Sequence, residues 1–237
     1  MIATFINCAT VLIGSIIGLL FNRRVTDRFR DVIYTGIGMF TMVIGIMMAL
    51  ETTRILFVAL SVVIGGLLGT WWSIERRILG LGHLLERKFG GSQKGESGSF
   101  AFGYLSASIL FCVGAMTIVG SFKAGAEGSY DIIYTKSVMD GFMAILLTAA
   151  MGIGVAFSII TILIYQGGLT LLAGLLSPYI SPLVLSELSG TGGILLMMIG
   201  LNLLKLKELK TGDFLPALAI IIVFAMLEPK ILSWISG

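Results

Sequence analysis

Residues 138–176, VMDGFMAILLTAAMGIGVAFSIITILIYQGGLTLLAGLL, form a long apolar run whose only charged residue is Asp140. As one straight α-helix these 39 residues would be about 58 Å long at a rise of 1.5 Å per residue. That is nearly twice the ~30 Å hydrocarbon core of a bilayer. The chain must therefore turn back, most naturally at Gly152–Gly154. We expect two membrane helices, about Val138–Ala156 and Phe157–Leu176, joined by a very tight turn.

The composition of the whole chain also favours a membrane protein. Of its 237 residues, 57% are hydrophobic and 12% are charged, and the mean hydropathy is +1.02. A soluble domain carries about 25% charged residues, so this chain has too little polar surface to face water. We therefore expect an all-α polytopic membrane protein, located in the inner membrane of a bacterium.

Six further segments are apolar enough to be membrane helices, since about 20 apolar residues cross the hydrocarbon core. With the two helices above, the sequence predicts about eight spans, with seven as the alternative. Only 14 residues separate Phe214 from Glu228. This last segment is thus too short to cross alone, and either Trp234 anchors its end at the interface or it crosses only in part. The six segments are Ile2–Phe21, Val32–Leu50, Ile55–Ser73, Phe100–Phe122, Leu188–Leu204 and Phe214 to about Ile235.

The distribution of lysine and arginine supports eight spans. With both termini outside, an eight-span chain has 12 cations on the cytoplasmic side and 4 outside, as the positive-inside tendency expects. A seven-span chain would divide them 10 to 6. The cytoplasmic cations are then Arg23, Arg24, Arg28, Arg30, Arg76, Arg77, Arg87, Lys88, Lys94, Lys205, Lys207 and Lys210.

Two parts of the chain resemble each other. Thr35-Gly36 matches Thr191-Gly192 at an offset of 156 residues, and after a one-residue gap Gly38, Met42, Ile44 and Gly45 match Gly193, Met197, Ile199 and Gly200. Residues 1–73 and 157–237 would then be two three-helix repeats, inverted across the bilayer because two spans, in residues 100–156, separate them. Inverted repeats are common in secondary transporters. The alternative is a chance match between helices of biased composition.

Residues 74–99 are expected on the cytoplasmic side. Apolar residues recur there at helical spacing, which predicts an amphipathic helix on the membrane surface, followed by a flexible Gly/Ser-rich linker at 90–99. A surface for a regulatory partner is the alternative. The apolar residues are Ile74, Ile78, Leu81, Leu85 and Phe89.

Asp140 is the strongest candidate for a functional residue, because ionisable groups inside membranes are costly and usually serve a function. Lys136 precedes it by four residues, so the two side chains can pair along one helix. The pair could couple a cation or a substrate, or it could be a neutralised structural pair near the outer interface.

Further candidates for substrate or ion binding lie in three other predicted spans. The segment CVGAMTIVGS at 112–121 is interrupted by glycines, and a broken helix exposes backbone groups that could hold an ion. For these glycines close helix packing is the alternative, and for the amides an interhelical hydrogen bond. The candidates are Gly114, Thr117, Gly120, Ser121, Gln166 and Asn202.

Several of these segments together resemble a family of uncharacterised bacterial inner-membrane proteins, the domain of unknown function 554 family of the YdfK/YqgA type. The resemblance rests on TFIN at 4–7 continuing to GLL at 18–20, and then on VGAMTIVGS at 113–121, KSVMDG at 136–141, GIGV at 152–155 and YQGG at 165–168. It covers essentially the whole chain. It implies a transporter-like membrane protein, and it brings no established substrate and no catalytic residues.

The sequence favours a secondary transporter or permease for a small solute. A channel-like pore, formed by a homodimer or a single chain, is one alternative, and a membrane scaffold or sensor acting through residues 74–99 is another. An enzyme is disfavoured because the chain has one histidine and two separate cysteines and lacks a phosphate-binding loop. We expect no cofactor, no metal and no nucleic acid; the expected partners are the lipid bilayer and a small solute or ion.

Overall fold

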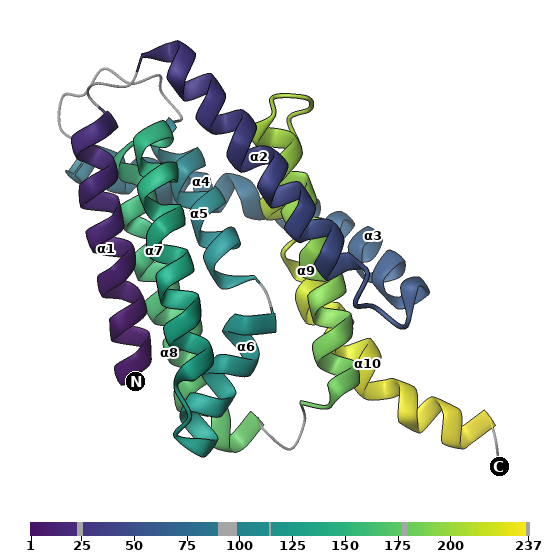
Figure 1. The fold of residues 1–237 in the computed structure, drawn as a ribbon. Helices are drawn as coiled ribbons and strands as arrows, with labels where there is room; N and C mark the ends of the chain where they lie inside the picture. The colour runs from purple at the N-terminus through teal and green to yellow at the C-terminus, as the bar shows by residue number, and fades with distance from the viewer. Residues whose placement is uncertain (23–25, 90–98, 114, 177–179, 236–237) are drawn as a thin grey trace.

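The computed structural model describes residues 1–22, 26–89, 99–113, 115–176 and 180–235, which form helices and short connections without a strand. The α-helices are joined by a π-helical turn at Lys123–Glu127 and by 3-10 turns at Ile153–Phe157 and Thr211–Phe214. Figure 1 shows their arrangement. They are α1 (Ile2–Asn22), α2 (Asp27–Ala49), α3 (Ile55–Trp72), α4 (Ile74–Phe89), α5 (Ser99–Cys112), α6 (Ala115–Phe122), α7 (Asp131–Met151), α8 (Ser158–Leu176), α9 (Pro182–Leu203) and α10 (Pro216–Ile235).

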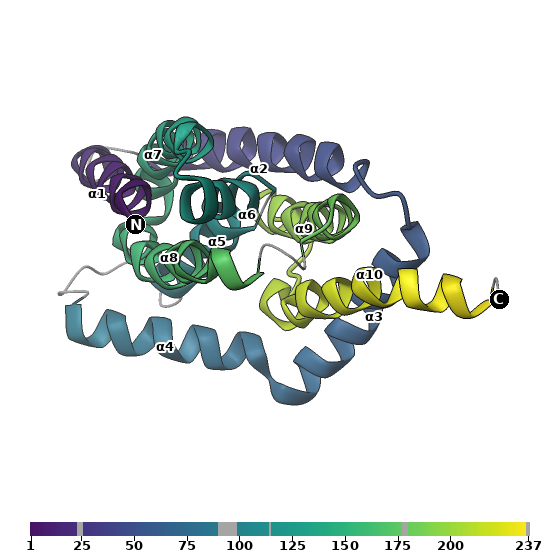
Figure 2. The same cartoon turned by 90° about the horizontal axis from the view of Figure 1, so that it is seen from below.

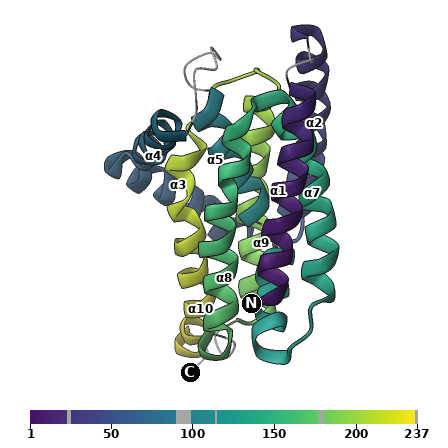
Figure 3. The ribbon, with the colours of Figure 1, turned by 90° about the vertical axis from the view of Figure 1, so that its left-hand side faces the viewer.

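The number of membrane helices agrees with the sequence. In the described part of the chain, seven helices are long and apolar enough to cross a membrane, and α5 with α6 forms a bent pair that would make an eighth span. The helix α1 begins, and α10 ends, toward the same end of the molecule (Figures 1 and 3). We call this the termini end. The first and last spans therefore run in opposite directions, as an even number of spans requires.

The predicted turn within residues 138–176 is confirmed at its glycines. Helix α7 ends at Met151, and Gly152 adopts φ +82° and ψ −160°, a positive-φ conformation that glycine reaches without steric penalty. Gly154 packs against the backbone of Phe100, where a side chain would collide. The expected boundaries of the first helix were wrong, because α7 runs from Asp131 to Met151. The start was expected at Val138, where the apolar run begins, but the helix also includes the polar residues 131–137.

The last helix lies close to the expected bounds of Phe214 to about Ile235, and it does not stop at Glu228. Helix α10 begins with Pro216, which suits a first helical position, and is 20 residues long, running past Glu228 to Ile235. The buried Glu228 carboxylate pairs with Arg54 at the start of α3, so its charge does not end the helix. The side chain of Trp234 lies outside the described part of the structure.

Glycines let the membrane helices approach closely, as expected where lipid gives no hydrophobic drive for association. Helices α2 and α9 pack antiparallel: a Cβ added to Gly45 would lie 2.8 Å from the carbonyl oxygen of Gly193. Helices α3 and α10 pack through Gly65, where an added Cβ would lie 2.5 Å from the backbone nitrogen of Ala217. Helix α1 packs along α7 (Figure 3).

Helix α4 lies across the bundle rather than along it. Viewed down α1, α7, α8 and α9, it runs lengthwise across Figure 2. Its start is tied to the turn before α10, because the Glu75 backbone N–H donates to Asp213 Oδ1 (2.9 Å) and the Gly212 N–H donates to Glu75 Oε2 (2.8 Å). Ile78 packs against the core. The side chains of Leu81, Leu85 and Phe89, and the linker at 90–98, lie outside the described residues.

Candidate functional site: a buried polar cluster

Four polar side chains from three membrane helices meet inside the bundle. The Asn7 amide of α1 donates to Asp140 Oδ2 of α7 (3.1 Å) and to Gln166 Oε1 of α8 (2.8 Å). The Lys136 ammonium, one turn before Asp140 on α7, donates to the same carboxylate oxygen. We call these residues, Asn7, Lys136, Asp140 and Gln166, the polar cluster.

The polar cluster is enclosed by protein. Asn7 and Gln166 have no exposed surface, and Lys136 and Asp140 are buried as well. Asp140 and Gln166 are near the middle of their helices, each about half of the way between the helix ends. Charges at such a depth are costly, and they are found where they pair or line a solute or ion pathway. Lys136 and Asp140 neutralise each other, so the cluster can exist without a net charge.

The polar cluster has unused hydrogen-bonding capacity. Asn7 Oδ1, an acceptor, and Gln166 Nε2, a donor, are both buried without a hydrogen-bond partner. Each unsatisfied group of this kind destabilises a protein by about 1–3 kcal/mol. These two atoms are left for a partner that offers one donor and one acceptor.

A glycine next to Asp140 explains how α1 and α7 come this close. Gly141 follows Asp140 and packs against α1, where a Cβ added to Gly14 would lie 2.2 Å from the Gly141 carbonyl oxygen and one added to Gly141 would lie 3.2 Å from Thr10 Cβ. Gly167, which follows Gln166, has room for a side chain, because an added Cβ there would lie 3.4 Å from Met1 Cε and 3.7 Å from Thr4 Cγ2. The close helix contact thus belongs to Asp140 and its neighbouring glycine.

The broken helix lies beside the polar cluster. Helix α5 ends at Cys112 and contacts α7, the helix that carries Lys136 and Asp140. The segments Phe100–Cys112 and Met116–Glu127 meet at 57°. The Thr117 hydroxyl donates to the carbonyl oxygen of Phe111 (3.2 Å), which satisfies one backbone group freed by the break.

The remaining candidates from the sequence lie elsewhere. Gly120 packs against α7, where an added Cβ would lie 2.7 Å from Ile133 Cδ1, and the Ser121 hydroxyl is buried without a partner. Asn202 holds the loop after α9, because its amide donates to the Leu209 carbonyl (2.8 Å) and accepts from the Leu209 N–H (2.7 Å). Gly114 lies outside the described residues.

Sequence reasoning did not foresee the role of Glu187. This residue of α9 is fully buried, and its carboxylate accepts hydrogen bonds from the Thr53 N–H (2.8 Å), the Thr53 hydroxyl (3.0 Å), the Arg54 N–H (3.1 Å) and the Thr52 hydroxyl. It thereby caps the start of α3. The sequence reading began the seventh span at Leu188 and left Glu187 just outside it. Glu187 stands four residues before Thr191-Gly192, as Asp31 stands four residues before the matched Thr35-Gly36. This repeated acid was the signal available in the sequence.

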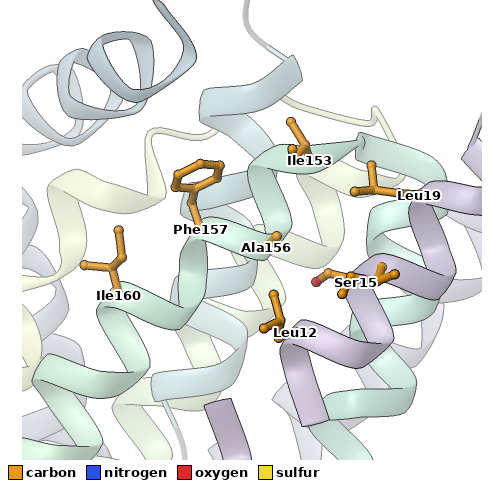
Figure 4. A pocket seen from close by; sticks show the side chains of 8 residues that line it. Leu12, Ser15, Leu19, Ile153, Ala156, Phe157 and Ile160 are labelled. Atoms are coloured by element: carbon orange, nitrogen blue, oxygen red, sulfur yellow. The ribbon is translucent and has the colours of Figure 1, made fainter. Parts of the chain in front are cut away.

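An apolar groove runs between α1 and the start of α8, separate from the polar cluster (Figure 4). Its volume is about 380 Å³, and apart from Ser15 its lining is apolar. The Ser15 hydroxyl is buried without a hydrogen-bond partner. Among the described residues no three His, Cys, Asp or Glu side chains come together as a metal site would require. The groove is lined by Leu12, Ser15, Ile16, Leu19, Ile153, Ala156, Phe157 and Ile160.

These features define a polytopic helical membrane protein with a charged cluster enclosed in its helical bundle. The model of the protein family described as "Protein of unknown function (DUF554)" matches residues 2–226 of this chain. The chain belongs to this family, which confirms the resemblance drawn from its motifs.

Two relatives are similar over almost their whole length. The "Uncharacterized membrane protein YdfK" of Bacillus subtilis (strain 168) is 30% identical over 233 residues, which cover 95% of this chain and 97% of the relative. The "Uncharacterized protein YqgA" of Escherichia coli (strain K12) is 29% identical over 218 residues, covering 92% and 93%. No solved structure matches the chain.

Proposed function

We propose that this protein is a secondary transporter or permease of the bacterial inner membrane, and that it moves a small polar solute through the polar cluster without covalent chemistry. The observation that carries the proposal is the meeting of Asn7, Lys136, Asp140 and Gln166 between three helices, with one acceptor and one donor left without a protein partner.

A purely structural role would favour a different solution. Buried ion pairs can often be replaced by apolar residues of similar volume without loss of stability, and sometimes with a gain. The chain nevertheless keeps a lysine, a carboxylate and two amides in the interior of its bundle. A bound solute would satisfy Asn7 Oδ1 and Gln166 Nε2, so it would remove a penalty that the empty site carries.

The contacts between the two sequence-matched parts of the chain support the inverted-repeat architecture that the proposal includes. Helix α1 contacts α8, α2 contacts α9 and α3 contacts α10, so each helix touches its counterpart. An added Cβ on Gly45 would lie 2.8 Å from Met197 Cγ, and one on its match Gly200 would lie 2.6 Å from Met42 Cγ. Met42 and Met197 are themselves matched, so the contact is reciprocal, as a two-fold relation requires.

The first test is a thermal-shift screen of purified protein against amino acids, organic acids, nucleobases and inorganic cations. A ligand that binds only the folded state adds roughly 2.7 kcal/mol of apparent stability at a hundredfold excess over its Kd. We expect a hit with wild type and its loss in Asp140→Asn. The matched control is Asp131→Asn, which changes an exposed acid on the same helix and should keep the shift.

The outcomes separate the candidate functions. A ligand-induced rise in unfolding temperature that persists in Asp140→Asn would show that the solute binds away from the polar cluster. No shift for any compound, together with a deletion of residues 74–99 that has the same effect on the cell as deletion of the whole protein, would favour the scaffold or sensor. Solute flux that does not depend on an imposed ion gradient would favour a channel.

A further inference from the structure

The apolar groove between α1 and α8 lies beyond the hydrogen bond that ties these two helices together. The Asn7 amide donates to Gln166 Oε1 (2.8 Å), which joins α1 to the middle of α8. On α1 the lining of the groove runs from Leu12 to Leu19, and α1 ends three residues later. The groove therefore extends from this tie toward the end of the molecule opposite the termini end (Figure 4).

The length of the groove fits within one leaflet of a bilayer. From Leu12 to Leu19, α1 rises about 10.5 Å at 1.5 Å per residue. One leaflet supplies about 15 Å, which is half of the ~30 Å hydrocarbon core. A membrane helix of another protein crosses the whole core, so it would need a longer contact surface than this groove offers. The length of the groove suits a single lipid chain.

The groove faces the bilayer. Of its lining residues, Leu12, Ile16 and Ile160 are 47%, 51% and 43% exposed, and all three belong to helices that are long and apolar enough to cross a membrane. These exposed surfaces therefore face hydrocarbon. The volume of about 380 Å³ and the apolar lining, with Ser15 as its one polar residue, are typical of ligand sites.

Three helices meet at the end of the groove that lies away from the termini end. The Asn22 amide at the end of α1 donates to the carbonyl oxygen of Ala149 (2.9 Å), and the Tyr34 hydroxyl of α2 donates to that of Ala150 (3.5 Å). Both acceptors are in the last turn of α7, and Ile153 of the groove lining follows directly. The first turns of α2 therefore lie beside this end of the groove.

The first turns of α2 carry positive charge. Arg30 stands one turn before Tyr34, and its Nε is buried without a hydrogen-bond partner. Arg28 is exposed. Residues 23–31 contain four arginines and two aspartates, of which Asp31 already pairs with Lys205. A phosphate group would supply the acceptor that the Arg30 Nε–H lacks, in a charge-assisted hydrogen bond.

We propose that the groove binds an anionic phospholipid, with one acyl chain between α1 and α8 and the phosphate group beside Arg28 and Arg30. Contact with the apolar lining holds the chain, because lipid itself gives no hydrophobic drive for association. The charge of the headgroup selects this lipid from the bulk bilayer, since basic sites at the cytoplasmic ends of membrane helices bind anionic headgroups. The site goes beyond the proposed transport and does not depend on it.

Native mass spectrometry of the full chain in detergent tests the groove, with phosphatidylglycerol or phosphatidylcholine added separately. Wild type should retain one phosphatidylglycerol molecule and severalfold less phosphatidylcholine. Ala156→Phe places a ring in the groove and should lower phosphatidylglycerol retention severalfold. The matched control Ala59→Phe places the same ring on an exposed face of α3 and should leave retention unchanged. If Ala156→Phe does not fold, Leu12→Trp narrows the groove from an exposed position and should act in the same direction.

The same measurement tests the headgroup site. Arg28→Gln/Arg30→Gln should lower phosphatidylglycerol retention severalfold, toward the level of phosphatidylcholine, because the two lipids differ in headgroup charge. Arg76→Gln/Arg77→Gln is the matched control, since it removes two exposed cations of α4, and it should retain the lipid as wild type does.

Phosphatidylglycerol retention that is unchanged in both Ala156→Phe and Leu12→Trp would overturn the groove as the lipid site. Equal retention of the two lipids by wild type, or retention that is unchanged in Arg28→Gln/Arg30→Gln, would overturn the selection by headgroup charge. A lipid-free dimer that Ala156→Phe converts to a monomer would show a second copy of the chain in the groove and would also overturn the proposal. These measurements use no solute, so the result of the screen with Asp140→Asn does not affect them.

Discussion

At the residue scale, the proposed solute site consists of the Lys136–Asp140 pair and the two amides around it. One carboxylate oxygen of Asp140 accepts hydrogen bonds from both Lys136 and Asn7, and the Asn7 amide also donates a hydrogen bond to Gln166. Three helices are therefore linked through a single amide. Any change at Asn7 alters the bonds on α7 and α8 together.

Replacing one member of the ion pair should be far worse than replacing both. Lys136→Met leaves the buried Asp140 carboxylate without its counter-charge, and breaking a buried pair in this way destabilises by about 3–5 kcal/mol. The double variant Lys136→Met/Asp140→Leu should recover most of that loss while abolishing solute binding. Thermal unfolding in detergent measures both. A double variant as unstable as Lys136→Met would contradict the assignment of the penalty to the unpaired charge.

Glu75, at the start of α4 outside the membrane spans, should make the stability of the folded protein depend on pH. Burial raises the pKa of its carboxyl above the ordinary 4.5, with a further rise from Asp213, although the Gly212 hydrogen bond and Lys210 lower it. The folded state then binds this proton more tightly than the unfolded state, so stability falls as the pH rises from 4.5 through the raised pKa.

The variant Glu75→Gln tests this dependence because it keeps an acceptor for the Gly212 N–H without a charge. We expect Glu75→Gln to unfold at a higher temperature than wild type at pH 7, and the difference to shrink toward pH 4.5. The control is Glu51→Gln, whose acid is exposed. A difference in unfolding temperature between wild type and Glu75→Gln that grows toward low pH would contradict the predicted direction of the pH dependence.

At the element scale, the sequence predicted the helices better than their contacts. The tight turn at Gly152 followed from helix length against membrane thickness, because both are fixed by simple geometry. The beginning of α7 was misjudged because the polar residues 131–137 precede the apolar run, and the continuation of α10 was misjudged because the partner of Glu228 was not known. Pairing across 174 residues, as between Arg54 and Glu228, leaves no local signal.

The candidate site was predictable to the same extent. Asp140, Lys136 and Gln166 stood out as polar residues in apolar segments, and the structure brings them together. The meeting point at Asn7, and the capping of α3 by Glu187, required knowledge of which helices are neighbours. Asn202 had the same appearance in the sequence, yet it bonds only with its own loop among the described residues.

The glycines of α2 differ in what they do, which gives a matched comparison. At Gly45 an added Cβ would lie 2.8 Å from the Gly193 carbonyl oxygen, whereas at Gly36 it would meet nothing within 4 Å. Gly45→Ala should therefore destabilise by about 1–3 kcal/mol through overpacking. Gly36→Ala should be neutral or stabilise by up to about 1 kcal/mol. Equal unfolding temperatures for the two variants would exclude a close α2–α9 contact.

At the scale of the whole molecule, the cations and the helices suggest one orientation. Twelve of the 16 cations fall on one side when both termini are outside, and α1 begins where α10 ends (Figure 1). The matched helices α1–α3 and α8–α10 then run in opposite directions. This is the arrangement that the proposed inverted repeat requires.

Reporter fusions test the orientation. A reporter active only outside the inner membrane should report at both termini, and one active only in the cytoplasm should report when inserted at 206–208, in the loop after α9. The positive-inside tendency is the physical reason, because the cations of that loop resist translocation. A cytoplasmic C-terminus beside an external N-terminus would contradict the eight-span arrangement and the inverted repeat.

The most direct test of the transport site is uptake into proteoliposomes of whichever compound raises the unfolding temperature in the screen. Wild type, Asp140→Asn and Asp131→Asn would be reconstituted at equal density, with and without an imposed proton or sodium gradient. We predict gradient-dependent uptake by wild type and Asp131→Asn and its loss in Asp140→Asn. Uptake by Asp140→Asn at the wild-type rate would contradict the assignment of solute transport to the polar cluster.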